Sequence, residues 1–368
     1  MIRVYAEDFV KTAGECDQIV CFGTGKIFSE AREFLEENGL LNKVRYCIDN
    51  NPDKQGREIE MGDGRAQILS LEEYEKRCKG NGFLLITCAR IEEVIAQLEQ
   101  TVNCSKLRYA CYNVIANVMA EMDAMKKRLP EKIALSDAPL IPKKIHYCWF
   151  GGNPVPDRYK KWMESWHKLC PDYEIIEWNE SNYDIGKNEY MRQAYEHRKW
   201  GFVPDYARLD IIYNHGGIYL DTDVELIANM DDMLYQKGFV GFESRKYVNL
   251  GLGFGAAKHH KMIKAFLESY EGLSFVNKDG SLNMTASPVY QTEALKKYGL
   301  ENNGEYQIIN DITVFPEKMF SGKSLSTRRI KLAAYSKSIH HYDGSWLSKE
   351  EKEHAEFCRK YISEELGE

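Results

Sequence analysis

The sequence predicts an α/β protein made of two domains. Its 368 residues are enough to form two hydrophobic cores. In both halves, short apolar runs alternate with amphipathic helical stretches, a pattern that indicates parallel sheets joined by right-handed crossover helices. With 43% hydrophobic and 29% charged residues, the composition is that of an ordinary globular chain.

The net charge, the apolar segments and the cysteine pattern limit which partners and which cellular location we expect for the protein. A formal net charge of −7 argues against a nucleic-acid partner, because such proteins need a basic face. We find no signal-like start and no run near the roughly 20 apolar residues of a membrane span. The ten cysteines are scattered without a C-x-x-C pair, which is typical of reduced thiols. We therefore expect a cytoplasmic protein, with at most peripheral association at the inner membrane face.

Residues 1–115 are predicted to form the first domain. Strands alternate with helices, the first helix carrying Ile27, Phe28 and Leu35 on one face. The expected strands are residues 19–22, 44–48, 83–88 and 107–111. This spacing predicts a small parallel α/β domain.

A glycine turn in this domain resembles a dinucleotide-binding fingerprint. Gly23 and Gly25 follow a strand, and Asp49 ends the next one, but Phe28 replaces the third glycine. The domain is similar to the Rossmann-like domains attached to many bacterial sugar-modifying enzymes. Two interpretations stay open: a bound nucleotide, or a structural or regulatory domain whose glycines serve only the turn.

The rest of the chain divides into three parts. Residues 116–140 read as a connector with a helix at 119–128, before Pro130. Residues 141–346 form the second α/β domain, which opens with a strand at 145–150. Residues 347–368 form a charged terminal helix, expected to act as a cap.

The stretch of residues 202–226 carries the chemistry. Asp205 and Arg208 share a helical face, and a short strand follows the glycine pair 216–217. That strand would deliver Asp221 and Asp223 on the same side at its end. Two carboxylates at one spot are costly without a cation between them, and their oxygens suit Mg²⁺ or Mn²⁺. The alternative is an ordinary solvated acidic turn.

Three segments carry a family resemblance: residues 141–152, 202–225 and 338–346. They resemble glycosyltransferase family 32, the D-x-D sugar-binding group that includes capsular polysaccharide and lipopolysaccharide transferases. The resemblance covers the second domain and not the first. It implies a GT-A type nucleotide-diphospho-sugar transferase domain, preceded here by the Rossmann-like domain. It also implies transfer with retention of configuration and a metal cofactor, Mn²⁺ or Mg²⁺.

The resemblance assigns roles to the acidic cluster. Asp221 would contact sugar or ribose hydroxyls and the metal, and Asp223 would be the principal metal ligand. His341 would complete the metal site, with its neighbour His340 as the alternative. Asp205 would bind donor hydroxyls, and Arg208 would lie near the sugar and diphosphate, where a guanidinium suits phosphate oxygens.

Other residues would complete the donor site. Trp149 would border the nucleotide base, and Tyr219 would lie under the donor unless it is a plain core aromatic. Ser345 and Trp346 would close on the β-phosphate, with packing as the alternative for Trp346. Residues 251–256 and Ser287 are weaker candidates, explained as well by a buried strand and a helix cap.

The expected enzyme is a retaining, metal-dependent hexosyltransferase. It would use a nucleoside-diphosphate sugar, UDP-sugar favoured, and a glycan acceptor that can be lipid-linked, in surface polysaccharide assembly. Since no residue stands out as a covalent nucleophile, front-face displacement is favoured. Two alternatives stay open: a toxin-like protein glycosyltransferase, and a non-catalytic binder of sugar nucleotides on a decayed transferase fold.

Overall fold

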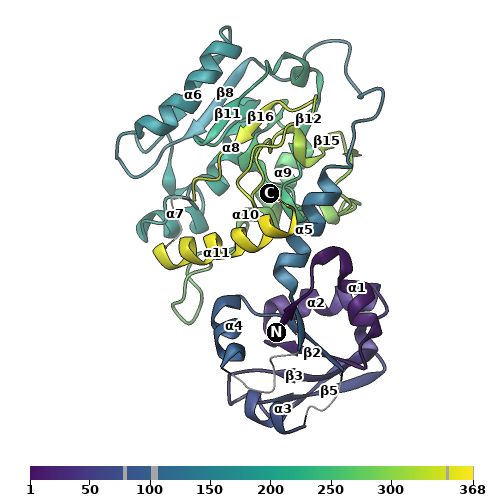
Figure 1. The fold of residues 1–368 in the computed structure, drawn as a ribbon. Coiled ribbons are helices and arrows are strands. Elements are labelled where there is room, and N and C mark those ends of the chain that lie inside the picture. Colours follow the sequence, from purple (N-terminus) through teal and green to yellow (C-terminus); the bar gives the residue numbers. More distant parts are fainter. Residues whose placement is uncertain (78–80, 101–106, 345–347, 368) are drawn as a thin grey trace. The chain divides into compact units, whose positions relative to one another are not determined.

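The computed structural model describes residues 1–77, 81–100, 107–344 and 348–367. The chain forms two compact units, drawn in Figure 1. Unit 1 contains Met1–Ala120 together with Lys349–Glu368, and unit 2 contains Glu121–Ser348. The C-terminal segment therefore returns to the first unit rather than ending on the second.

Unit 1 is built on a seven-stranded sheet with strand order β1-β7-β6-β2-β3-β5-β4. Its strands are β1 Ile2–Arg3, β2 Gln18–Phe22, β3 Val44–Ile48, β4 Glu58–Met61, β5 Gly64–Leu69, β6 Gly82–Ile86 and β7 Arg108–Cys111. Its helices are α1 Ala6–Glu15, α2 Lys26–Glu37, α3 Leu71–Arg77, α4 Ile91–Glu99, most of α5 Tyr112–Ala124, and α11 Lys349–Glu365. All pairs are parallel except the β4–β5 hairpin, which the sequence analysis missed.

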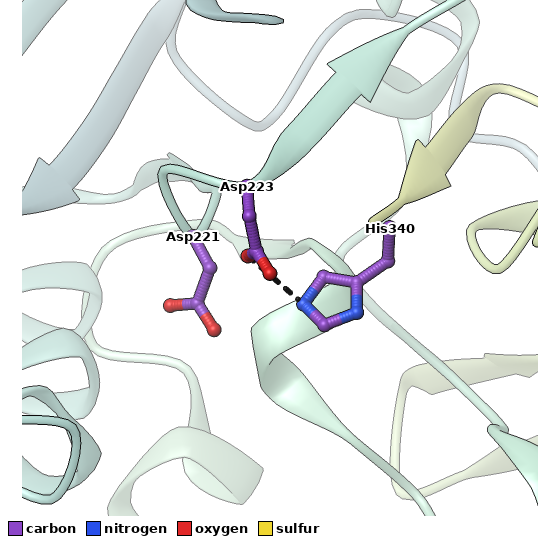
Figure 2. A group of neighbouring side chains, drawn as sticks. All are labelled: Asp221, Asp223 and His340. Carbon is purple, nitrogen blue, oxygen red and sulfur yellow. Dashed lines mark ion pairs between the residues drawn. The ribbon is translucent and has the colours of Figure 1, made fainter. Parts of the chain in front are cut away.

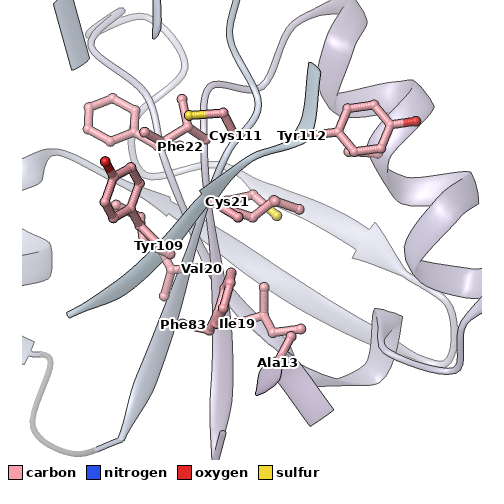
Figure 3. Close-up of a cluster of buried hydrophobic side chains, with 14 of the residues drawn as sticks. Ala13, Ile19, Val20, Cys21, Phe22, Phe83, Tyr109, Cys111 and Tyr112 are labelled. Atoms are coloured by element: carbon pink, nitrogen blue, oxygen red, sulfur yellow. The ribbon is translucent and has the colours of Figure 1, made fainter. Parts of the chain in front are cut away.

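The central strands of unit 1 are apolar along nearly their whole length. Residues 19–22 of β2 and 83–86 of β6 are all buried, as expected for a parallel sheet covered on both faces. Figure 3 shows Phe83 and Ala13 among the side chains of this core. The predicted α/β class is confirmed here by the parallel pairing itself.

The glycine turn after β2 is closed by a carboxylate of the same unit. Gly23 has φ 101°, and a Cβ there would meet the Cβ of Cys88 at 2.7 Å. Asp49 accepts hydrogen bonds from the Thr24 N–H at 3.0 Å and from the Thr24 hydroxyl. It also pairs with Lys54 Nζ at 3.0 Å. The glycine is thus required by close backbone packing at the turn.

Two helices differ from or extend the sequence prediction. The helix predicted at 119–128 begins at Tyr112 and ends at Ala124, because its first turns bury Val114, Ile115 and Val118 in the core of unit 1. The charged terminal helix is α11, held to the start of the chain. Arg3 pairs there with Glu364 at 2.9 Å and with Glu365 at 2.8 Å.

Unit 2 has a second seven-stranded sheet, with strand order β14-β15-β12-β13-β10-β8-β9, and a two-stranded sheet of β11 and β16. Its strands are β8 Lys144–Cys148, β9 Glu174–Trp178, β10 Gly217–Tyr219, β11 Val224–Leu226, β12 Gly238–Gly241, β13 Phe254–Ala256, β14 Gln307–Ile309, β15 Ile312–Phe315 and β16 Ser338–His340. Its helices are α6 Asp157–Leu169, α7 Glu189–Glu196, α8 Pro204–His215, α9 Lys261–Glu268 and α10 Ser287–Lys296.

The sheet of unit 2 is mixed rather than mostly parallel. β10 pairs parallel to β8 and antiparallel to β13. The connection from β12 to β13 contains only short 3-10 turns, and an antiparallel neighbour needs no long crossover. The predicted α/β class is confirmed in this unit as well. Among the described residues, no helix is long and apolar enough to span a bilayer.

Candidate active site in unit 2

A helix, a glycine pair and a buried strand deliver the two aspartates. Helix α8 runs from Pro204 to His215 and is capped by Gly216, whose φ is 65°. A Cβ on Gly217 would lie 2.8 Å from His146 Nε2, so only glycine fits where the chain enters β10. Strand β10 then ends at Tyr219, before either aspartate.

The two aspartates lie on a turn and not on a strand, which corrects the reason given for their convergence. The Val224 N–H donates to the Asp221 carbonyl at 3.0 Å and closes the turn. Asp221 and Asp223 therefore come together because the chain reverses between β10 and β11. Strand alternation plays no part.

A third group reaches the aspartates from far along the chain. Strands β11 and β16 pair antiparallel, with Val224 opposite His340. His340 Nε2 lies 3.2 Å from Asp223 Oδ1, and this ion pair is the dashed line in Figure 2. Ligand atoms of Asp221, Asp223 and His340 all lie within 4.8 Å of one another. Such a set of two carboxylates and one imidazole suits a divalent cation.

The structure brings His340 to this cluster, where the sequence analysis placed His341 and kept His340 as the alternative. His341 Nε2 instead lies 2.8 Å from Glu225 Oε2. Its ring stacks on the ring of Trp162 at a centroid distance of 4.1 Å. Adjacent residues at a strand end point to opposite faces, so only one of the two histidines can reach the aspartates.

The charges of the cluster depend on one another. Burial alone would raise the pKa of Asp223, but the ion pair with His340 outweighs it and lowers that pKa to about 2. Burial raises the pKa of Asp221, although the Arg208 guanidinium opposes it. The pKa of His340 is raised. Burial alone would lower it by disfavouring the imidazolium cation, but the facing Asp223 carboxylate stabilises that cation and outweighs burial. The other ring nitrogen of His340, Nδ1, has no hydrogen-bond partner in the described residues.

Arg208 is buried between two aspartates. It forms an ion pair with Asp205 on the same face of α8, and its Nη1 lies 3.6 Å from Asp221 Oδ1. Its Nη2 also donates to the Ser287 hydroxyl at 2.8 Å. Ser287 makes no side-chain cap at α10, so the simple cap explanation for this serine is wrong. Arg208 Nε lacks a partner in the described residues.

The chain segment before β13 packs directly against the aspartate turn. A Cβ on Gly251 would collide with Asp221 Oδ2, so any larger residue here would displace that carboxylate. Asn249 Oδ1 accepts the Gly251 N–H at 2.7 Å. Gln291 and Thr292 of α10 accept backbone N–H groups of the same segment, at 3.0 and 2.9 Å. The first turns of α10 thus hold the segment that packs against Asp221.

Trp149 directly follows β8, and its ring meets the Tyr159 ring edge-on at 5.7 Å. The Tyr159 hydroxyl donates to Asp343 at 2.5 Å, and the Asp343 N–H donates to Asp223 Oδ2 at 3.0 Å. Trp149 is thereby linked to the aspartate turn. Ser345 and Trp346, predicted to close on the donor, lie outside the described residues.

Tyr219 is fully buried below the site. The Arg208 guanidinium lies 5.9 Å from the centre of its ring, and the Phe254 ring packs against it at 5.8 Å. The ring can support the guanidinium from one side while still being a core aromatic. Its burial fits the core-aromatic alternative, and its position under a donor stays a prediction.

Glu243 is a polar residue of this region that the sequence analysis missed. Burial raises the pKa of its carboxyl group to about 7, and it accepts a hydrogen bond from Asn249 Nδ2 at 2.8 Å. The charges of His340 and Glu243 also influence each other. No motif marks Glu243 in the sequence; only the strand order brings it here.

The chain is similar to a known protein family and to several known proteins. The family model described as glycosyltransferase sugar-binding region containing DXD motif matches residues 156–240. Inositol phosphoceramide mannosyltransferase 3 of Schizosaccharomyces pombe is 28% identical over 139 residues, covering 37% of this chain and 38% of that protein. Mannosyl phosphorylinositol ceramide synthase SUR1 of Saccharomyces cerevisiae is 26% identical over 200 residues, covering 51% and 52%. The chain thus spans about half or less of these two relatives.

Among solved structures, one similar chain is the PaToxG glycosyltransferase, with TM-score 0.36 and 18% identity, covering 56% of this chain and 77% of that one. The predicted resemblance to D-x-D glycosyltransferases is confirmed by the family match, within residues 156–240. That range contains Asp205, Arg208, Asp221 and Asp223 but not His340.

Proposed function

We propose that unit 2 transfers a hexose from a nucleoside-diphosphate sugar to an acceptor hydroxyl. The match of residues 156–240 to the glycosyltransferase sugar-binding region containing a DXD motif supports this proposal. The observation that carries the proposal is the cluster of Asp221, Asp223 and His340 beside the buried Arg208. Carboxylates, an imidazole and a guanidinium at one place suit a metal-bound diphosphate.

The acidic residues and the histidine would bind the metal ion, and the arginine would bind the donor. Asp223 and His340, with Asp221, would hold Mn²⁺ or Mg²⁺. Such an ion, when bound, would offset negative charge on the departing diphosphate. Arg208, fixed by Asp205 and the Ser287 hydroxyl, would direct its guanidinium at the phosphate oxygens or donor sugar. Because these groups are ordered before the donor arrives, they would need little rearrangement in the transition state.

The stereochemistry proposed is retention by front-face displacement. The acceptor oxygen forms a bond to the anomeric carbon as the bond to the diphosphate oxygen breaks, and the acceptor proton passes to the diphosphate. A covalent mechanism would need a carboxylate free to attack the anomeric carbon. The buried Asp205 carboxylate is already paired with Arg208, so it is poorly placed to act as that nucleophile.

Other residues would contact the donor. Trp149, beside Tyr159, would border the nucleotide base, and Asp205 and Asp221 would contact sugar hydroxyls.

The acceptor is proposed to be a glycan, which can be lipid-linked, in surface polysaccharide assembly. The two relatives described above bear the names of enzymes that mannosylate inositol phosphoceramide, a lipid, and this supports a lipid-linked acceptor. GDP-mannose is therefore included beside the UDP-sugars among the donors to be tested. Location at the cytoplasmic membrane face is part of the same proposal.

Donor hydrolysis tests the proposal. Purified full-length protein with Mn²⁺ would be incubated with a panel of UDP- and GDP-sugars, and release of nucleotide measured. We expect slow, metal-dependent hydrolysis of one donor. Asp223→Ala should reduce it by about 10²-fold or more, since it removes the residue with the strongest metal-ligand character.

The matched control is Asp279→Ala, which removes an exposed acid from a loop of the same unit. It should leave hydrolysis unchanged. If no donor is bound or hydrolysed in the presence of metal, the transferase proposal fails and the sugar-nucleotide-binding alternative loses its donor as well. Binding of one donor without any turnover would favour the non-catalytic alternative.

A further inference from the structure

Unit 2 exposes apolar side chains on two neighbouring segments. Met122 and Met125, around the end of α5, are 45% and 48% exposed. Ile330 and Leu332, on the loop before β16, are 56% and 51% exposed. A single exposed apolar residue is ordinary, but four on adjoining segments form a surface that water solvates poorly.

The two segments are joined through buried and ordered contacts. Glu121 is 2% exposed, accepts from the Ser324 hydroxyl, and has Lys331 Nζ at 3.8 Å. Met125 lies one helical turn after Glu121, so its side chain is on the face that meets the loop. The Tyr335 hydroxyl donates to the Lys127 carbonyl at 3.3 Å. The apolar side chains therefore belong to one surface.

The same surface carries positive charge. Lys126, Arg128 and Arg329 are exposed beside these apolar residues. From residue 318 to residue 342 the chain has no Asp or Glu but contains six Lys and Arg, in a protein of net charge −7. Two of the six are engaged elsewhere, because Lys318 is buried against Glu317 and Lys337 pairs with Asp232 at 2.7 Å. Of the neighbouring acids, Glu121 is buried, and Asp123 pairs with Lys127 and Lys246 at 3.3 and 3.2 Å. The exposed Glu305 also pairs with Lys127, at 3.3 Å. Glu131 is the exposed acid nearest in the sequence.

We propose that Met122, Met125, Lys126, Arg128, Arg329, Ile330 and Leu332, called here the basic-apolar surface, dock unit 2 on an anionic lipid bilayer. Apolar side chains enter the boundary between headgroups and acyl chains, and the surrounding cations attract acidic headgroups. Charge complementarity supports this occupant, because the cations gather beside the apolar side chains of a protein whose net charge of −7 would otherwise be repelled by an acidic membrane.

The position of the surface relative to the candidate active site gives docking a purpose. The Lys331 N–H donates to the Gly322 carbonyl at 2.8 Å, and the Gly322 N–H donates to the Ser338 carbonyl of β16 at 3.1 Å. Strand β16 ends at His340 of the aspartate cluster. A bilayer held here would bring lipid-linked acceptors near the donor site. Only this purpose rests on the proposed function; the surface itself does not.

Vesicle sedimentation tests the inference with the full chain and no donor. We expect binding to phosphatidylcholine vesicles containing phosphatidylglycerol and little binding to phosphatidylcholine alone. Raising the salt from about 0.15 M to about 0.5 M should weaken binding by screening the cations. Ile330→Asp should lower the partition coefficient about tenfold, and Arg329→Glu should lower it severalfold.

The matched control is Met284→Asp, an exposed apolar residue, 41% accessible, on another loop of unit 2. It should bind vesicles like the parent protein. Donor hydrolysis without vesicles and the melting temperature should be unchanged in all three variants, which separates this test from that of the proposed function.

Three results would overturn the inference. Equal binding to neutral and anionic vesicles would remove the role of the cations, and absence of binding would remove the membrane altogether. If Ile330→Asp changes the molecular mass by ultracentrifugation and not the vesicle partition, the surface joins copies of the chain instead.

Discussion

The two units share an α/β plan but treat carboxylates differently at the ends of their strands. In unit 1, Asp49 is satisfied within a few residues by Asn51 and Lys54 and by Thr24 of the adjacent turn. In unit 2, Asp221 and Asp223 face each other and depend on His340, more than a hundred residues later. One carboxylate closes a turn, whereas the others leave ligand atoms directed at a common point.

This difference shows why similar sequence patterns should not be given similar functions. A glycine turn followed by an acid occurs in both units. In unit 1, Asp49 accepts hydrogen bonds from the N–H and hydroxyl groups around it, and these contacts hold the turn together. In unit 2 the nearby donors are supplied by a buried guanidinium and a distant imidazole, and part of their bonding capacity remains open.

The largest effect is expected from Arg208→Ala. The substitution leaves Asp205 buried without its partner, which costs about 3–5 kcal/mol of unfolding free energy. Donor hydrolysis should fall by about 10²–10³-fold, since a preorganised cation is lost. Urea unfolding and nucleotide release measure the two effects. Arg192→Ala, which removes an exposed helical ion pair, is the control and should change stability by less than about 1 kcal/mol.

The next effect separates the two adjacent histidines. His340→Ala should reduce metal-dependent hydrolysis about 10²-fold and weaken Mn²⁺ binding measured by calorimetry, because it removes one corner of the proposed metal site. His341→Ala removes only the contacts with Glu225 and Trp162 and should leave the Mn²⁺ affinity near that of the parent. Equal losses of affinity in both variants would contradict the assignment of His340.

A third prediction concerns acid stability of unit 2. Burial lowers the pKa of His146, which contacts the Gly216 carbonyl at 2.9 Å, to about 4. Above pH 6.5 the imidazole is neutral in the folded and unfolded chains, so its full contribution to the unfolding free energy is present. As the pH falls from 6.5 towards 4, only the unfolded chain gains the proton, and about 3 kcal/mol of stability should be lost.

Thermal unfolding between pH 7 and pH 4 measures this loss. His146→Gln should flatten the dependence over that window. In unit 1 the corresponding loss should come at lower pH: burial opposes ionisation of Asp49, but the hydrogen bonds from Thr24 and its neighbours lower its pKa below the ordinary value. Simultaneous acid unfolding of both units, unchanged in the variant, would rule out His146 as the cause.

The smallest effect is expected from Asp49→Ala. Loss of the hydrogen bonds to Thr24 and of the ion pair with Lys54 should lower the unfolding free energy of unit 1 by about 2 kcal/mol. Donor hydrolysis should stay at the parental rate, since this carboxylate is structural. A clear loss of hydrolysis without loss of stability would instead support a bound nucleotide in unit 1.

Several features could be predicted because they depend on local sequence. The strands at 44–48 and 107–111 and the helix from 91 follow from apolar runs and period, and the structure places them within one or two residues. Residues 204–215 form the expected helix, bringing Asp205 and Arg208 to one face. The β4–β5 hairpin was missed because its strands are short and carry Glu58, Glu60 and Arg65 among their apolar residues, which weakens the strand signal.

The sequence by itself determined the α/β class of both units, the helix that carries Arg208, and the identity of the aspartate pair, since each depends on neighbours within about ten residues. Only the tertiary structure decided between His340 and His341, gave Ser287 its bond to Arg208, and brought Glu243 near the cluster. These contacts join segments that are distant in the sequence. Strand pairing such as β11 with β16 fixes which side chain faces inward, and a shift of one residue would reverse the choice.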